Sequence, residues 1–185
     1  MQIHICASCS GINRRNIICA AGLSVFGSSI FSEALAMTIT TTTLPEDEAF
    51  MRLALDEARK GDFPFGAVIV RNGAAVASGH NRGIKSNDPT AHGEMVAIHN
   101  FVSKSPSGEL NGATIYTTGE PCPMCMGAIL WCGFGRMVYA ASINQLSSRI
   151  GQIMITSSTI ADAATENKIE ITGGVLASEA LALFK

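Results

Sequence analysis

Side chains that can bind a metal occur at two places in the chain. One is His92, in the stretch DPTAHGE at 88–94, and the other is the pair Cys122 and Cys125, in EPCPMC at 120–125. A CxxC pair alone is compatible with a disulfide, a redox pair or a metal site. The nearby prolines predict helix starts, where thiolates are favoured, and the i, i+3 spacing puts both sulfurs on one face. One nitrogen and two sulfurs leave a fourth tetrahedral position open, which is typical of catalytic zinc.

Glu94 adds an acid–base group to this set. It follows His92 by two residues, too close along a helix for a comfortable second ligand but close enough to reach a water at the open position. Zinc lowers the pKa of such a water towards 7, and a carboxylate can carry its proton to a leaving group. The sequence therefore predicts hydrolytic release of an amine from an electron-poor ring carbon, with Glu94 catalytic. A non-catalytic zinc or thiol-redox protein is the alternative from a different class, and it would leave Glu94 without a role.

Strands and helices must position these residues. Pro45 and the acids that follow it predict the start of a helix that ends near Gly61. Its expected apolar stripe consists of Phe50, Leu53, Ala54 and Ala58. Strands are expected at 66–70, 74–80, 113–118, 136–142 and 168–173, and further helices at 91–102, 122–132 and 175–184. Asn72-Gly73 predicts a hairpin turn between the first two strands. A hairpin followed by alternating helices and strands predicts a three-layer α/β domain with a mixed sheet.

The first 36 residues have the pattern of an export signal. An arginine pair at 14–15 precedes an apolar stretch at 17–31 that is too short to span a bilayer, and a small-residue cleavage pattern ends at Ala36. The arginine pair fits a twin-arginine signal, which predicts a periplasmic or exported enzyme. The mature chain, 37–185, is then a single domain with no stable membrane span. Two alternatives remain: a buried helix, or a true start at Met37 with a cytoplasmic location.

The motifs resemble those of a known enzyme family. HGE at 92–94 and PCPMC at 121–125 match the pattern H-x-E…P-C-x-x-C of zinc-dependent nucleobase deaminases. The chain resembles the cytidine and deoxycytidylate deaminase superfamily over 48–185, and within it the guanine deaminase and tRNA-adenosine deaminase branch. The resemblance implies a cytidine deaminase-like α/β/α fold with a five-stranded mixed sheet, usually in a dimer or larger assembly. It also implies zinc as the cofactor and four residues at the site: His92, Cys122 and Cys125 as ligands and Glu94 as proton shuttle.

The resemblance further implies which residues contact the substrate. An asparagine that matches Asn81 hydrogen-bonds the substrate, and the start of the first sheet strand lines the pocket. The substrate-binding residues expected on this basis are Asn81, Phe65, Gly66, Ala67 and Pro121. Two departures from the family stand out: Gly93 replaces a usual alanine, and SRIGQIMITSSTIADA at 148–163 replaces a segment in which many guanine deaminases carry acids. The segment 143–165, or Asp162 within it, is the open candidate for completing the pocket.

Composition and charge bear on the substrate. The 185 residues are 47% hydrophobic and 15% charged, as in a globular protein, and the net charge of -2 disfavours nucleic acid as a partner. A small base needs only a closed pocket, stacking and a few hydrogen bonds. The prediction is hydrolytic deamination of a free purine-type base, guanine first, by a homodimer. The alternatives are deamination of tRNA adenosine, and of cytosine or a nucleoside.

Three further residues carry structural predictions. Glu120, beside the cysteine motif, is expected to receive backbone hydrogen bonds at the turn from strand to helix. Trp131 and Phe134 are expected to pack in the core or at the dimer contact.

Overall fold

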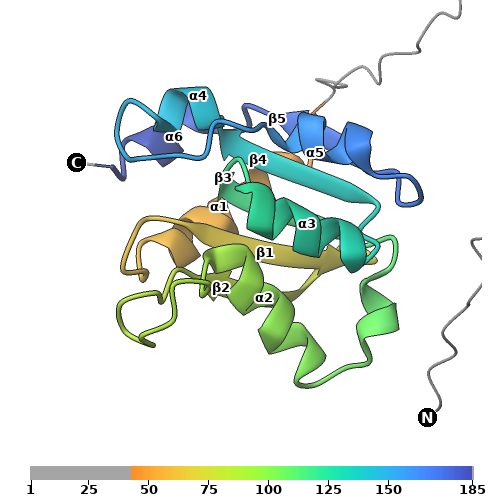
Figure 1. Cartoon of the computed structure of the whole chain (residues 1–185). Coiled ribbons are helices and arrows are strands. Elements are labelled where there is room, and N and C mark those ends of the chain that lie inside the picture. The colour runs from red at the N-terminus through yellow and green to blue at the C-terminus, as the bar shows by residue number, and fades with distance from the viewer. Residues whose placement is uncertain (1–42, 185) are drawn as a thin grey trace, which may run out of the picture. The chain divides into compact units, whose positions relative to one another are not determined.

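A five-stranded mixed sheet carries the fold (Figure 1). The computed structural model describes residues 43–184. The strands are β1 (Gly66–Arg71), β2 (Ala74–His80), β3 (Thr114–Gly119), β4 (Arg136–Ala141) and β5 (Glu170–Gly173), in the order β2-β1-β3-β4-β5. β1 is antiparallel to β2 and to β3, whereas β3, β4 and β5 are parallel. The predicted five-stranded mixed sheet is confirmed.

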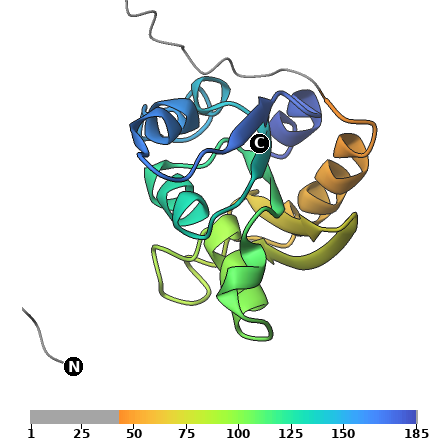
Figure 2. The same ribbon diagram turned by 90° about the vertical axis from the view of Figure 1, so that its right-hand side faces the viewer.

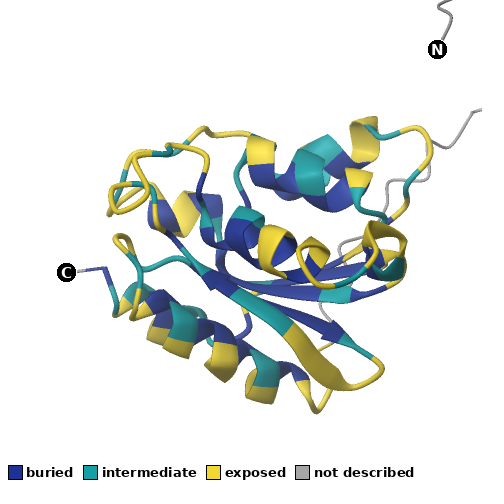
Figure 3. Cartoon of the chain, turned by 90° about the horizontal axis from the view of Figure 1, so that it is seen from below, coloured by how far each residue is buried: buried dark blue, intermediate teal, exposed yellow. Residues whose placement is uncertain are grey.

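Helices cover both faces of the sheet, so the predicted three layers are confirmed (Figure 2). One face packs against α2 (Gly93–Val102), α3 (Pro123–Trp131) and α5 (Ser157–Ala163). The other face packs against α1 (Asp47–Ala58) and α6 (Ala177–Leu181). A short 3-10 helix, Ser107–Leu110, precedes β3, and α4 (Ile143–Leu146) follows β4. Figure 3 shows that the central strands are largely buried and that the outward sides of the covering helices are exposed.

The hairpin between β1 and β2 forms where the sequence predicts it. Asn72 and Gly73 have φ angles of 52° and 73°, both in the left-handed region. Such angles at both central residues give a turn whose twist matches that of the two strands, and asparagine and glycine adopt them at little cost. The turn leaves β2 at the edge of the sheet, antiparallel to β1.

The buried face of α1 differs from the predicted stripe. The buried apolar residues are Met51, Ala54, Leu55 and Ala58. Leu53, which was expected to face the core, is 44% exposed. The two faces share Ala54 and Ala58, so the apolar spacing alone did not distinguish them. Asp47, in the first turn of the helix, is buried on the same face as Leu55.

Asp47 forms a buried ion pair with Arg136 of β4. Arg136 Nη1 donates to Asp47 Oδ1 at 2.6 Å and Nη2 donates to Oδ2 at 2.8 Å. The Tyr116 hydroxyl also donates to Oδ1, at 2.9 Å, and the Leu44 N–H donates to Oδ2 at 2.7 Å. Burial alone would raise the pKa of Asp47, but the hydrogen bonds from Arg136, Leu44 and Tyr116 outweigh it and hold the pKa below its usual value. The pair joins the start of α1 to the start of β4.

Replacing Asp47 with alanine is expected to destabilise the protein by about 3–5 kcal/mol, because the change leaves the Arg136 guanidinium buried without its partner. Denaturant unfolding measures the loss. Asp56→Ala on the same helix is the control: Asp56 pairs with Arg59 on the surface, so its loss should cost less than about 1 kcal/mol.

The difference between wild type and Asp47→Ala should also depend on pH. A carboxyl with a lowered folded pKa contributes stability above its unfolded pKa, about 3.9, and loses it as the pH falls through the folded value. The difference should therefore shrink in acid. Equal stability of the two proteins at neutral pH would show that the pair does not hold the fold.

Several predictions concern residues at the surface or outside the described range. Phe134 is 1% exposed and lies in the core as predicted, but Trp131 is 86% exposed on α3, so it does not pack in the core. A dimer contact at Trp131 stays a prediction. The predicted leader, 1–36, lies outside the described residues, and export stays a prediction. Within the described residues, no helix is long and apolar enough to cross a membrane.

Candidate active site

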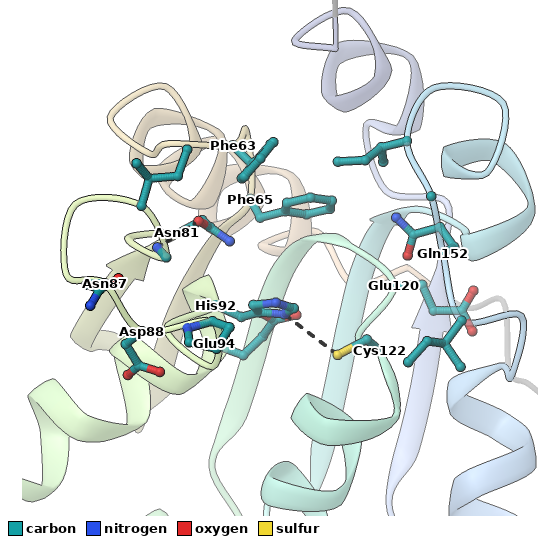
Figure 4. A pocket seen from close by; sticks show the side chains of 16 residues that line it. Phe63, Phe65, Asn81, Asn87, Asp88, His92, Glu94, Glu120, Cys122 and Gln152 are labelled. Carbon is teal, nitrogen blue, oxygen red and sulfur yellow. Dashed lines mark hydrogen bonds between the residues drawn. The ribbon is translucent and has the colours of Figure 1, made fainter.

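A cavity of about 550 Å³ lies at one end of the sheet (Figure 4). β1 begins at this end, whereas β2, β3 and β4 end there, so four separate chain segments converge on it. The lining residues that bear on the chemistry are Phe65, Asn81, His92, Glu94, Glu120, Cys122 and Gln152. Two of the predicted ligands, His92 and Cys122, therefore meet the predicted catalytic acid Glu94 in a single cavity, and the third ligand, Cys125, is fully buried next to them.

His92 and Cys122 occupy equivalent positions on two helices. Each is the N-cap of its helix, α2 and α3, and has an extended backbone, with ψ angles of 160° and 167°. Pro123 stands at the first helical position of α3, where its missing N–H is not needed, and its ring favours the extended conformation of Cys122. A Cβ at position 93 would lie only 2.9 Å from the Phe65 carbonyl oxygen. Because Gly93 has no Cβ, the start of α2 can pack directly against the start of β1.

The three predicted ligands lie at distances that suit a zinc ion. His92 Nδ1 is 3.7 Å from Cys122 Sγ and 3.6 Å from Cys125 Sγ. The three ligand atoms all lie within 4.8 Å of one another. Tetrahedral zinc, with Zn–N of about 2.0–2.1 Å and Zn–S of about 2.3 Å, holds nitrogen and sulfur about 3.6 Å apart. The set of one imidazole and two thiols therefore fits zinc in both geometry and donor chemistry.

The two thiols have different affinities for protons. The hydrogen bond from Cys125, supported by that from His92, lowers the pKa of Cys122 to about 4, so Cys122 is a thiolate at neutral pH. The pKa of Cys125 is raised, because its thiol donates to Cys122 and is buried. The hydrogen bond to Cys122 also raises the pKa of His92. A thiolate already present at the cavity floor is the form of cysteine that binds metal.

Glu94 is buried beside this set. Its side chain belongs to the first turn of α2, is only 6% exposed, and faces the cavity (Figure 4). Burial is the largest influence on the carboxyl and raises its pKa. A carboxyl group with a raised pKa that lines the same cavity as His92 and Cys122 is suited to accept a proton and return it, as the sequence predicts.

The structure separates the predicted substrate contacts into two groups. Phe65 and Asn81 line the cavity. Gly66, Ala67 and Pro121 are buried and do not line it. A Cβ on Gly66 would lie 2.3 Å from the Ala54 carbonyl oxygen, which shows that this part of β1 packs against α1 and not against the cavity. Of the three residues expected at 65–67, only Phe65, which precedes β1, lines the cavity.

The Asn81 amide has a defined orientation. Its Oδ1 accepts the N–H of Gly83 at 3.1 Å, which closes a local turn just after β2. The backbone of Asn81 is also held, because its N–H donates to the Phe65 carbonyl at 2.9 Å and its carbonyl accepts from Asp62 at 2.9 Å. With Oδ1 held by the Gly83 N–H, the amide nitrogen of Asn81 can donate a hydrogen bond into the cavity.

Glu120 has the structural role that the sequence predicts, but with different partners. It accepts backbone N–H groups from Ile143 and Ser157, at the starts of α4 and α5, and not from its own turn. These partners lie 23 and 37 residues further along the chain, which no local pattern could indicate.

The segment after β4 supplies the remaining wall of the cavity. Ile150, Gly151, Gln152 and Ile153 line it, which answers the question left open for 143–165. Asp162 is exposed on α5 and does not line the cavity, so it does not replace the acids of the family. Gln152 was missed because one glutamine among apolar residues carries no recognisable signal.

Comparisons with known proteins agree with the site. Residues 44–141 match the zinc-binding region of cytidine and deoxycytidylate deaminases. Guanine deaminase of Bacillus subtilis is 43% identical over 99 residues, 51% of this chain and 64% of that enzyme, just under two thirds. A tRNA-specific adenosine deaminase of Haemophilus influenzae is 38% identical over 138 residues, 72% of this chain and 78% of that enzyme.

A solved structure also resembles this fold. Guanine deaminase from Nitrosomonas europaea has a TM-score of 0.67 at 25% identity, covering 80% of this chain and 87% of that one. The predicted resemblance to the guanine and tRNA-adenosine deaminase branch is confirmed, as is the predicted class of enzyme. The chain is a hydrolytic deaminase of the cytidine and deoxycytidylate deaminase family.

Proposed function

We propose that the protein deaminates a free purine-type base, with guanine as the first candidate, and that zinc is its cofactor. The cavity at the convergence of His92, Glu94 and Cys122 carries this proposal, because it combines a metal-binding set, a buried proton carrier and room for one base. His92, Cys122 and Cys125 would hold the ion. When bound there, zinc supplies a Lewis acid that activates water for attack.

The chain's own residues supply the remaining steps. Glu94 takes the two protons of the attacking water in turn and delivers one to the neighbouring ring nitrogen and the other to the departing amine. The carbon–nitrogen bond breaks, a carbonyl forms on the ring and ammonia leaves. Asn81 donates a hydrogen bond to the base, and the ring of Phe65, held edge-on by Phe184 at a centroid distance of 5.1 Å, offers an apolar surface beside it. Burial of the site keeps bulk water away from these proton transfers.

The lining of the cavity favours a small neutral base. The described lining includes the acids Asp88, Glu94 and Glu120 but no lysine or arginine, so an anionic phosphate finds no partner there. A cavity of about 550 Å³ is within the range used for small ligands. The guanine deaminases named above support guanine as the base.

Deamination of tRNA adenosine is the second candidate. The Haemophilus influenzae relative, named for that activity, matches a longer part of this chain than the Bacillus subtilis guanine deaminase does. That reaction requires a surface that neutralises several phosphates around the cavity. The open question is thus whether the cavity receives a free base or a base that is still attached to RNA.

A screen for ammonia release distinguishes the candidates. The purified protein is incubated with guanine, adenine, cytosine, their nucleosides, aminotriazines and unmodified tRNA, each at the same concentration of reactive base. Turnover of guanine above all other compounds is the expected result. Turnover confined to tRNA would replace the proposal with the second candidate, and its salt dependence would then report the phosphate contacts.

A further inference from the structure

The wall of the cavity between α4 and α5 is tethered at both ends to one buried carboxylate. Glu120 is 7% exposed; its Oε2 accepts the Ile143 N–H at 2.9 Å and its Oε1 accepts the Ser157 N–H at 2.8 Å. Further bonds cap the helices themselves: Ser142 accepts the Gln145 N–H, and Thr156 accepts the Thr159 N–H. Glu120 therefore fixes where this segment begins and ends relative to the end of β3.

The tethered segment presents one polar side chain to the cavity. Gln152 is half-buried, and Figure 4 shows its amide directed inward from the side opposite Asn81. The other lining residues of the segment are Ile150, Gly151 and Ile153, which offer no polar side chain. Among the residues drawn in Figure 4, the Gln152 amide makes no hydrogen bond, so both its donor and its acceptor are available to a ligand.

The chemistry of an amide indicates what Gln152 can recognise. A primary amide offers a donor and an acceptor side by side, and so pairs in two-point fashion with a base edge that carries an adjacent acceptor and donor. Apart from the edge that includes the departing amine, guanine has two such edges, the lactam N1–H/C6=O and the amidine N3/N9–H. Asn81, whose oxygen is engaged by Gly83, adds a single donor from the opposite wall.

We propose that Gln152 is a specificity-determining residue that reads an adjacent donor–acceptor edge of the base, and that Glu120 is the positioning residue that holds Gln152 in place. The proposal rests on the proposed function for the substrate class, but it concerns a contact that the zinc and Glu94 chemistry does not require. Residues 147–156, between α4 and α5, contain no acid, and in this proposal the neutral amide of Gln152 recognises an uncharged edge of the base.

Two variants at Gln152 test the contact on the free base that wild type deaminates fastest. Gln152→Leu removes both polar groups, and Gln152→Glu keeps the length but replaces the donor with an acceptor. Each is expected to lower kcat/KM about 10–100-fold, the effect of losing one or two hydrogen bonds, mainly through KM and with unchanged zinc content. Met154→Leu is the matched control, because Met154 lies on the same segment, is 56% exposed and does not line the cavity.

Binding without reaction provides an independent measurement. Hypoxanthine keeps both edges of guanine but has no amine to lose. Calorimetric titration should show wild type and Met154→Leu binding it equally and Gln152→Leu binding it about 10-fold or more weakly. Among methylated guanines, wild type should lose affinity for 1-methylguanine if the lactam edge is read and for 9-methylguanine if the amidine edge is read. Undiminished affinity for both would overturn the two-point contact.

Glu120→Gln tests the positioning role. Glutamine has one side-chain acceptor, so it can tether only one end of the segment, and KM should rise about 10-fold or more while kcat and zinc content stay near wild type. Asp162→Asn, an exposed acid on α5 outside the cavity, should change nothing. An unchanged KM in Glu120→Gln would overturn the positioning role.

The outcomes separate this inference from the proposed function. If wild type deaminates a free base and Gln152→Leu has the same kcat/KM and the same affinity for hypoxanthine, Gln152 does not determine specificity although the function stands. If wild type releases no ammonia from any free base but deaminates tRNA, the proposed function fails first, and the inference fails with it.

Discussion

Replacing Cys122 with serine is expected to leave the purified protein without its metal and without deaminase activity. The wild-type chain should hold about one zinc ion, because its one nitrogen and two sulfur ligands lie at tetrahedral distances for that ion. Serine at 122 replaces a thiolate with a hydroxyl that is protonated at neutral pH and is a poor ligand. Metal analysis of the purified proteins, together with ammonia release, measures both losses.

Two further variants show whether the loss is specific. His92→Ala removes the ligand on the other helix and should lose zinc as Cys122→Ser does. Cys132→Ser is the matched control, because Cys132 ends α3, is half-exposed and lies outside the cluster of ligand atoms. It should keep both zinc and activity. Full zinc content in both Cys122→Ser and His92→Ala would show that these residues do not bind zinc.

Local patterns in the sequence were sufficient to predict that His92, Cys122 and Cys125 lie together. Pro89 lies three residues before His92, and Pro121 and Pro123 flank Cys122. Cys125 is one turn beyond Cys122, so short-range rules predict the position of each side chain on its helix. That the two helix starts meet follows from the mixed sheet, since β2 and β3, which precede α2 and α3, both end at the same end of it. The proximity of these three side chains could be predicted because each requirement was local or followed from the order of the strands.

The remaining features depend on contacts between distant residues. Asp47 was expected only to favour a helix start, but it is paired with Arg136, 89 residues further on, and lies on the same buried face of α1 as Leu55. A charged residue in a first turn has the same local pattern whether it is exposed or buried. The distinction depends on whether a partner is available across the sheet, which the spacing along the helix does not reveal.

The cavity wall formed by residues 150–153 was even harder to predict from local patterns. The segment 143–165 has no clear periodicity, and α4 and α5 within it are only 4 and 7 residues long. Neither helix was predicted, because helices of this length have little intrinsic stability and depend on tertiary contacts. Glu120 supplies two of these contacts. The part of the cavity wall that includes Gln152, the residue proposed to select the substrate, therefore lies where the sequence is least informative.

Replacing Glu94 with glutamine is expected to lower kcat by about 10²–10⁴-fold, the usual contribution of a general acid–base group. Glutamine has nearly the same shape and can stay in the buried site, but it cannot take a proton from water or return one to the amine. Because Glu94 is not among the three clustered ligand atoms, the variant should keep its zinc. Steady-state rates of ammonia release and metal analysis on one preparation measure both quantities.

The Glu94→Gln result separates catalysis from binding. Affinity for hypoxanthine should change much less than kcat, since the lost group acts on protons and not on the edge of the base. Glu48→Gln, a change of an exposed acid at the start of α1, should leave the rate, zinc content and affinity at wild-type values. If Glu94→Gln kept near-normal turnover, its buried carboxyl would be structural, and the zinc set would belong to a site that works without this proton carrier.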